Sequence, residues 1–252
     1  LLELGGEQQM ISLGERNEGY LAKVGEPLIQ FYGYKTCGVW NSAEEIAANP
    51  HFSDDAPGGI RIVDTNNDGS LTPEDRVALG TPYPDFTWGI TNTFQIKDFD
   101  ISFLIQGVQG ITVLNGDVYY NETKKWNKKY TKNRWVSAEH PGDGKTPYQN
   151  VKTGHDLMLT DYPLQNASYA CLRNFTVGYT LPATAARKIK LSGVRFYVSG
   201  SNLFYIWGSG YKGINPESRM TSGDYSSAMI SGYQRGGFPL TSTISAGFDI
   251  NF

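Results

Sequence analysis

The stretch from Asp64 to Asp75 is the segment whose side chains best fit a chemical task, the binding of a cation. It reads Asp-Thr-Asn-Asn-Asp-Gly-Ser-Leu-Thr-Pro-Glu-Asp, which matches the D-x-[DN]-x-[DN]-G pattern of calcium loops. Calcium is a hard cation that takes several oxygen ligands at once. The pattern predicts ligands from the side chains of Asp64, Asn66 and Asp68, the carbonyl of Ser70, a contact at Thr72 and the carboxylate of Asp75.

The last ligand position of this segment departs from the usual pattern. Asp75 stands where calcium loops carry a longer Glu, which binds through both oxygens. The flanking residues do not predict paired helices, and no second loop of this kind occurs in the sequence. We therefore expect an isolated, structural calcium site, and the alternative is a loop of Asx turns that holds no metal.

Aromatic residues in two long segments, 110–167 and 207–238, form a second group of candidates. Rings interleaved with lysines can stack on sugars or contact a partner, and they also occur in proteins that bind single-stranded nucleic acid. The net charge of −3 argues against nucleic acid. The predicted substrate or partner contacts are Trp126, Tyr130, Trp135 and Tyr211. The alternative is that these are ordinary solvated loops whose rings pack on their neighbours.

Between these segments the sequence alternates between apolar and polar residues, the pattern of strands with two different faces. The predicted strands are 86–97, 99–106, 169–181, 194–206 and 240–252. In 169–181 the alternation places Tyr169 on the same face as Phe175. Several of these strands run to about 10–13 residues, close to the ~9–11 that a strand needs to cross a bilayer.

The composition agrees with an all-β protein. The chain has 16 Tyr, 12 Phe, 5 Trp and 29 Gly among 252 residues, which favours strands and turns. The mean hydropathy is −0.39, and no apolar run is long enough for a membrane-spanning helix. Short connections at 97–98 and 182–192 alternate with the two long segments, as in outer-membrane β-barrels.

Six strings in the sequence resemble, in order, the C-terminal part of the SusC/RagA family of TonB-dependent outer-membrane transporters. They are Gly25–Tyr34 (GEPLIQFYGY), Asp64–Asp75, Pro84–Gly89 (PDFTWG), Arg173–Pro182 (RNFTVGYTLP), Val198–Phe204 (VSGSNLF) and Asn215–Glu217 (NPE). Each string alone is short, and their common order over roughly 18–252 is what identifies the family.

The resemblance implies a transmembrane antiparallel β-barrel in the outer membrane of a Gram-negative bacterium. Residues 1–252 would be the C-terminal portion of a large, 22-stranded plugged barrel with long extracellular loops. The resemblance also implies import of oligosaccharides or peptides, a SusD-like surface lipoprotein as lid, contact with the TonB complex and with outer-membrane lipid, and no catalytic residues. The sequence opens at Leu1, without a methionine, in the middle of an apolar-to-polar pattern that runs to Gly14, so we expect further sequence upstream.

Two other functions fit parts of the sequence. A secreted, calcium-stabilised carbohydrate-binding β-sandwich would also show alternating strands, with their apolar faces forming a core. A glycoside hydrolase would need two carboxylates facing one another across a cleft. Most acidic residues lie in the 64–75 segment or in turns, which makes the hydrolase the weakest of the three hypotheses.

Overall fold

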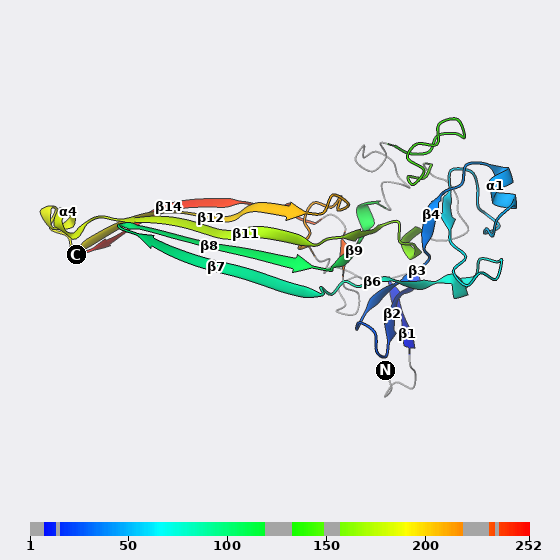
Figure 1. Ribbon diagram of the computed structural model, residues 1–252, viewed down its shortest axis with the longest axis horizontal. Coiled ribbons are helices and arrows are strands. Elements are labelled where there is room, and N and C mark those ends of the chain that lie inside the picture. Colours follow the sequence, from blue (N-terminus) through cyan, green and yellow to red (C-terminus); the bar gives the residue numbers. More distant parts are fainter. Residues whose placement is uncertain (1–7, 14–15, 119–132, 149–156, 219–231, 235–236) are drawn as a thin grey trace.

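The computed structural model describes residues 8–13, 16–118, 133–148, 157–218, 232–234 and 237–252. A long, gently twisted sheet projects from a compact end that contains the N-terminal strands, as Figure 1 shows. The chain terminates at the far tip of the sheet, beside α4. Within the described ranges, no helix combines the length and the apolar character needed to cross a membrane.

The projecting sheet contains five strands in the order β14-β12-β11-β8-β7, and every neighbouring pair is antiparallel. Their bounds are β7 Phe86–Ile96, β8 Phe99–Gln109, β11 Tyr169–Thr180, β12 Gly193–Trp207 and β14 Thr243–Asn251. These match the five strands predicted from alternation to within three residues at each end. Strands of 9–15 residues are longer than the roughly 5–6 usual in globular proteins.

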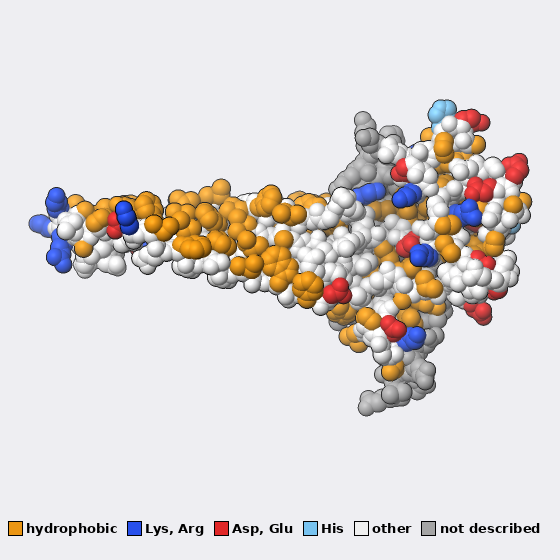
Figure 2. Space-filling model, in the orientation of Figure 1, with side chains coloured by type: hydrophobic (Ala, Val, Ile, Leu, Met, Phe, Trp, Pro, Cys, Tyr) orange, Lys and Arg blue, Asp and Glu red, His pale blue; other side chains and the backbone are white. Residues whose placement is uncertain are grey.

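One face of this sheet is apolar and exposed. Directly opposite residues share a face, and Phe196 lies opposite Phe248, while Ile90 lies opposite Ile105. Ile244 at the β14 edge is 74% exposed. The orange side chains along the projecting sheet in Figure 2 show how continuous this band is. An apolar band of this extent is far larger than soluble monomers tolerate, so it needs an apolar environment.

A bulge in β11 corrects one prediction from the alternation. Leu172 pairs with Ile105 and Asn174 pairs with Leu104, so β11 has one residue more than β8 at this point. The extra residue, Arg173, reverses the parity of the strand. Tyr169 therefore lies on the opposite face from Phe175, and it is buried at the compact end rather than exposed in the apolar band.

The polar face carries an ion-pair ladder near the tip. The Arg195 guanidinium on β12 donates from Nη2 to Asp100 Oδ2 on β8 at 2.6 Å, and from Nη1 to Asp249 Oδ2 on β14 at 3.4 Å. The β8 contact passes over β11 at Gly178, where an added Cβ would collide with both Asp100 and Arg195. Glycine in the middle strand is therefore what allows charges on β8 and β12 to meet.

Short connections close the tip of the sheet. Lys97 and Asp98 form the β7–β8 turn, as predicted. The β11–β12 connection, predicted only as a short loop, contains the helix α4, Ala183–Lys188. Its last turn carries Arg187 and Lys188, which is a favourable place for cations on a helix.

The compact end is built from shorter elements. Their bounds are β1 Gln8–Leu13, β2 Arg16–Lys23, β3 Gln30–Gly33, β4 Thr36–Val39, α1 Ala43–Ala47, β5 Ile60–Ile62, η1 Pro73–Asp75, β6 Val77–Gly80, β9 Thr112–Asn115, η2 Leu157–Leu159, β10 Leu164–Asn166 and β13 Tyr233–Gln234. The helix α1 is capped by Ser42, whose Oγ accepts from the Glu45 amide at 3.2 Å, and a Ser followed three residues later by Glu is a sequence that favours such a cap. The two long segments, 110–167 and 207–238, were expected to be loops. Their described parts contain strands, β9 and β10 in the first segment and β13 in the second.

The core of the compact end joins segments that are distant in sequence. One cluster packs Tyr20 and Phe31 against Leu114 and Tyr233. A second cluster packs Tyr34, Ile60 and Trp135 with their neighbours. Residues that precede the projecting sheet in sequence therefore pack against residues from the connections between its strands.

Gly33 at the end of β3 lets the 157–161 segment approach this core. An added Cβ would overlap the carbonyl oxygen of Leu159. That carbonyl accepts from the Tyr34 amide at 2.7 Å, and the Tyr34 carbonyl accepts from the Asp161 amide at 3.0 Å. The absence of a side chain at Gly33 is thus a condition for this pairing.

We expect Gly33→Ala to destabilise the compact end by about 1–3 kcal/mol, because the methyl group forces the two backbones apart. Hydrogen exchange of the Tyr34 and Asp161 amides measures the effect directly. Gly208→Ala is the matched control, since an added Cβ there has nothing within 4 Å. Equal protection in the two variants would contradict this reading of Gly33.

Candidate functional site

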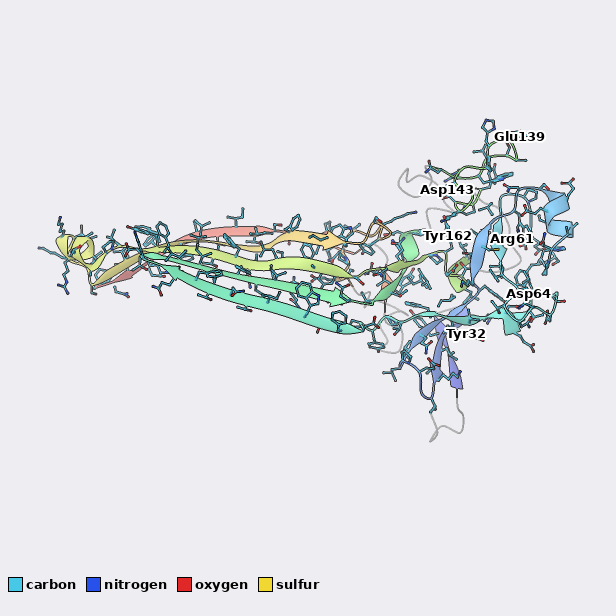
Figure 3. All side chains as sticks on the ribbon, viewed as in Figure 1. Tyr32, Arg61, Asp64, Glu139, Asp143 and Tyr162 are labelled. Carbon is cyan, nitrogen blue, oxygen red and sulfur yellow. The ribbon has the colours of Figure 1, made fainter. Side chains whose placement is uncertain are left out.

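The first half of the 64–75 segment is a turn that hydrogen bonds from backbone amides to its own side chains hold together. The Asp64 carboxylate accepts from the Asn67 amide at 2.7 Å and from the Gly69 amide at 2.9 Å. Asp68 accepts from the Ser70 amide at 2.8 Å. Gly69 has φ +85°, a left-handed conformation that suits glycine and makes the sharp turn. Figure 3 labels Asp64 at the outer edge of the compact end, away from the projecting sheet.

Asp75 behaves differently from the other predicted ligands, because it is fully buried and faces the backbone. Its Oδ1 accepts from the Thr65 amide at 2.9 Å and its Oδ2 from the Thr72 amide at 2.8 Å. Thr72 also caps η1, and its Oγ1 accepts from the Glu74 amide at 3.2 Å. Burial by itself raises the pKa of Asp75, but the amides of Thr72, Thr65 and Asn66 outweigh it and hold the pKa below its usual value.

The donor set fits calcium in part. Asp64, Asn66, Asp68 and the Ser70 carbonyl lie on one turn of exposed backbone, and each of the three side chains keeps oxygen lone pairs beyond those used inside the loop. Asp75 is already engaged by three loop amides. Among the described residues, no three His, Cys, Asp or Glu side chains converge as a ready-made metal cluster. An ion bound at this segment would take its ligands from residues 64–70, because Asp75 is used to close the loop through the Thr65 and Thr72 amides.

The predicted contact residues fall into two groups. Trp126 and Tyr130 lie outside the described residues. Trp135 is 9% exposed, and its Nε1 donates to Asn41 Oδ1 at 3.2 Å. Tyr211 is 5% exposed and donates to Gln234 Oε1 at 2.7 Å. The structure gives Trp135 and Tyr211 packing roles, and their contact with a substrate or partner stays a prediction.

A polar pocket of about 630 Å³ lies at the compact end between β4 and the 143–146 turn. Its lining consists of Thr36, Cys37, Gly38, Asp143, Gly144, Lys145, Thr146, Tyr162 and Lys212. Burial by itself raises the pKa of Asp143, but the Thr146 and Lys145 amides, at 2.7 and 2.9 Å from its carboxylate, outweigh burial and hold the pKa below its usual value, so Asp143 is anionic. Asp143, Lys145 and Lys212 place charged residues in the lining, so the pocket offers groups that a polar ligand could bond. Figure 3 labels Asp143 and Tyr162.

The bulge in β11 directs Arg173 onto the polar face, where it joins the sheet to the following loop. Its Nη2 donates to Glu217 Oε1 at 2.7 Å and its Nη1 to Asn202 Oδ1 at 2.8 Å. Its Nε donates to Gln106 at 3.2 Å, and Tyr205 donates to Glu217 at 3.0 Å. This network ties β8, β11 and β12 to the 208–218 segment with charge-assisted bonds.

Sequence reasoning overlooked the Arg173 network and the pocket. Arg173 was seen only as part of a resembling string, although a cation inside an alternating strand is itself a signal of a polar partner. The pocket had no such signal, because β4 and the 143–146 turn, which line it, are more than 100 positions apart in the sequence.

The comparisons with known proteins agree with this geometry. The chain is 30% identical over 239 residues to the TonB-dependent receptor P26 of Formosa agariphila, covering 91% of this chain and 23% of that receptor. It is 26% identical over 192 residues to the TonB-dependent receptor SusC of Bacteroides thetaiotaomicron, covering 76% of this chain and 17% of SusC. No protein-family model matches the chain.

Solved structures show the same fold. A structure of the RagAB peptide transporter superposes with a TM-score of 0.71 at 18% identity, covering 98% of this chain and 25% of that chain. The RagAB peptide importer in its closed-closed state gives a TM-score of 0.68 at 19% identity. The present chain spans about a quarter of the length of the curated relatives it matches first.

The long strands with one apolar face define the wall of a transmembrane β-barrel. The strands described form an open five-stranded part of that wall. The chain belongs to the SusC/RagA family of TonB-dependent receptors.

We expect Arg173→Lys and Glu217→Gln each to loosen the 208–218 segment, and the double variant to show a coupling energy of about 1–3 kcal/mol. The planar guanidinium bonds to Glu217, Asn202 and Gln106 at once, which a lysine cannot reproduce. Hydrogen exchange of the Glu217 and Tyr211 amides reports the opening.

Arg195→Lys is the control for this cycle, because it removes an equivalent guanidinium from the same face near the tip. It should leave the exchange of the 208–218 segment unchanged. Additive single effects, with no coupling between Arg173 and Glu217, would show that the network does not hold the loop.

Proposed function

We propose that this chain forms part of the barrel wall and the external surface of a nutrient importer in the outer membrane of a Gram-negative bacterium. The observation that carries the proposal is the continuous apolar band on one face of five long, registered strands. The relatives of this chain are named as receptors, and the superposed structures as importers, rather than as enzymes. These names support a transport role.

The two faces of the sheet suit this role. The apolar band would lie against lipid, where each backbone group must find a partner inside the sheet. The polar face, with Arg173 and Arg195 in bonded networks, would face the lumen. The short turns at the tip would lie on the periplasmic side, and the compact end with its pocket would lie outside the cell.

We propose oligosaccharides as the imported nutrients, with peptides as the second candidate. Oligosaccharide import is what the sequence resemblance implies, and the superposed structures are of a peptide transporter. Import would use the TonB complex and a SusD-like lipoprotein lid, as the names SusC and RagAB suggest. The polar pocket near Asp143 suits the hydroxyl, amide and charged groups of either class.

Uptake in the native bacterium tests this function. We expect deletion of the gene to abolish uptake of a labelled oligosaccharide or peptide mixture, and inactivation of TonB to have the same effect. The nutrient class whose uptake is lost identifies the substrate. Unchanged uptake of both classes, or recovery of the protein outside the outer membrane, would contradict the proposal.

We also propose that the 64–70 turn binds a structural calcium ion. The observation that supports it is the set of loop hydrogen bonds that aligns Asp64, Asn66 and Asp68. At a free calcium concentration a hundred times the dissociation constant, the ion would stabilise the loop by about 2.7 kcal/mol.

We expect a chelator to increase hydrogen exchange across residues 64–75 in the purified receptor, and added calcium to reverse it. Asp64→Ala should remove the response to calcium, whereas Asp54→Ala, which changes an exposed acid outside the loop, should keep it. Exchange that does not respond to chelator or calcium would show that the segment is an Asx-turn loop without metal.

A further inference from the structure

The tip of the projecting sheet carries a group of exposed cations. Arg187 and Lys188 end α4, and Lys190 follows two residues later. Lys97 lies in the adjacent β7–β8 turn, which is held to β11 because the Thr180 amide donates to the Asp98 carbonyl at 2.8 Å. Figure 2 shows Lys and Arg side chains gathered at this end of the sheet, directly beyond the apolar band.

The cations of the α4 connection have no anionic partner among the described residues. Three arginines elsewhere among the described residues are paired: Arg61, Arg173 and Arg195 have a carboxylate at 2.9, 2.7 and 2.6 Å respectively. The 181–192 connection contains no acidic residue, and the only one in the neighbouring turn is Asp98. The two connections at the tip therefore carry four cations, Lys97, Arg187, Lys188 and Lys190, and one acid, Asp98.

The backbone of these turns does not explain why lysine is present. Lys97 has φ +55° and Lys190 has φ +60°, the left-handed region where glycine or asparagine costs less. A lysine at such a position is conformationally unfavourable by roughly 1 kcal/mol. Lys97 and Lys190 adopt this conformation despite its energetic cost, and each places an ammonium group at the tip.

Exposed apolar side chains border the cations. Ile189 lies between Lys188 and Lys190 and is 56% exposed. Phe252 is 94% exposed, and Ser192 fixes that end of the chain by donating from Oγ to the Phe252 carbonyl at 2.6 Å. A surface that combines unpaired cations with exposed apolar groups matches the boundary between lipid headgroups and acyl chains.

We propose that the α4 connection binds the phosphate group of an anionic phospholipid in the leaflet that meets this end of the sheet. Arg187, Lys188 and Lys190 hold the phosphate, while Ile189 and Phe252 contact the acyl chains. Lys97 adds charge from the neighbouring turn. The proposal rests on the proposed membrane location, and it adds a specific class of lipid and the residues that select it.

The test uses the intact receptor, purified and depleted of lipid, with phosphatidylglycerol as the probe and phosphatidylcholine as the uncharged comparison. Native mass spectrometry counts bound lipids during titration. We expect Lys188→Glu/Lys190→Glu to weaken phosphatidylglycerol binding by about 30-fold or more, which corresponds to about 1 kcal/mol for each cation removed. Binding of phosphatidylcholine should not change.

Lys23→Glu/Lys35→Glu is the matched control, since it reverses two exposed lysines of the compact end. Lys190→Gly guards against a folding defect, because glycine suits φ +60° and the variant removes one cation without strain. It should weaken phosphatidylglycerol binding about fivefold. Equal binding by wild type and both tip variants would overturn the proposal.

Two further outcomes separate this inference from the proposed function. If inorganic phosphate at millimolar concentration displaces phosphatidylglycerol completely, the site holds phosphate ions and the lipid assignment is wrong. If the variants bind phosphatidylglycerol normally while the receptor still imports its nutrient, only this inference fails. A receptor that is recovered outside the outer membrane would overturn both.

Discussion

In an antiparallel sheet, the register of pairing decides which face each side chain occupies, and this constraint governs the projecting half of the molecule. Five strands keep a continuous ladder, so Phe196, Phe248 and their neighbours gather on one face. The same ladder satisfies the backbone groups between neighbouring strands, which is the condition for placing a sheet in hydrocarbon. A slip of one residue would exchange the apolar and polar faces.

The bulge at Arg173 shows how a single extra residue changes the face on which the side chains of a strand lie. Before the bulge, Tyr169 and Cys171 face inward and join the core of the compact end. After it, Phe175 and Val177 join the apolar band, through pairing with Phe103 and Ile101. The residue at the break is directed onto the polar face, where it bonds to Glu217. One local irregularity thus separates a packed end from a lipid-facing wall, and it also anchors the loop that follows.

The compact end differs from the projecting sheet because it buries polar side chains. Asp75 is fully buried and is surrounded by backbone amides, which stabilise its charged form. Asn115 donates to Gln165 at 3.1 Å, and Tyr211 donates to Gln234, so buried polar side chains from distant segments satisfy one another. These bonds hold the segments between the long strands in defined positions.

Local sequence patterns by themselves determined the five long strands, the cap of α1, the tight turn at Lys97 and the Asx-type hydrogen bonds of the 64–70 turn. These features depend on neighbours within a few positions, so alternation and turn chemistry predict them. Tertiary structure decided the rest. The face of Tyr169 depended on a bulge defined by the partner strand β8, and the buried state of Asp75, Trp135 and Tyr211 depended on contacts across the fold. No pattern within one segment encodes such contacts, because they exist only after distant segments pack together.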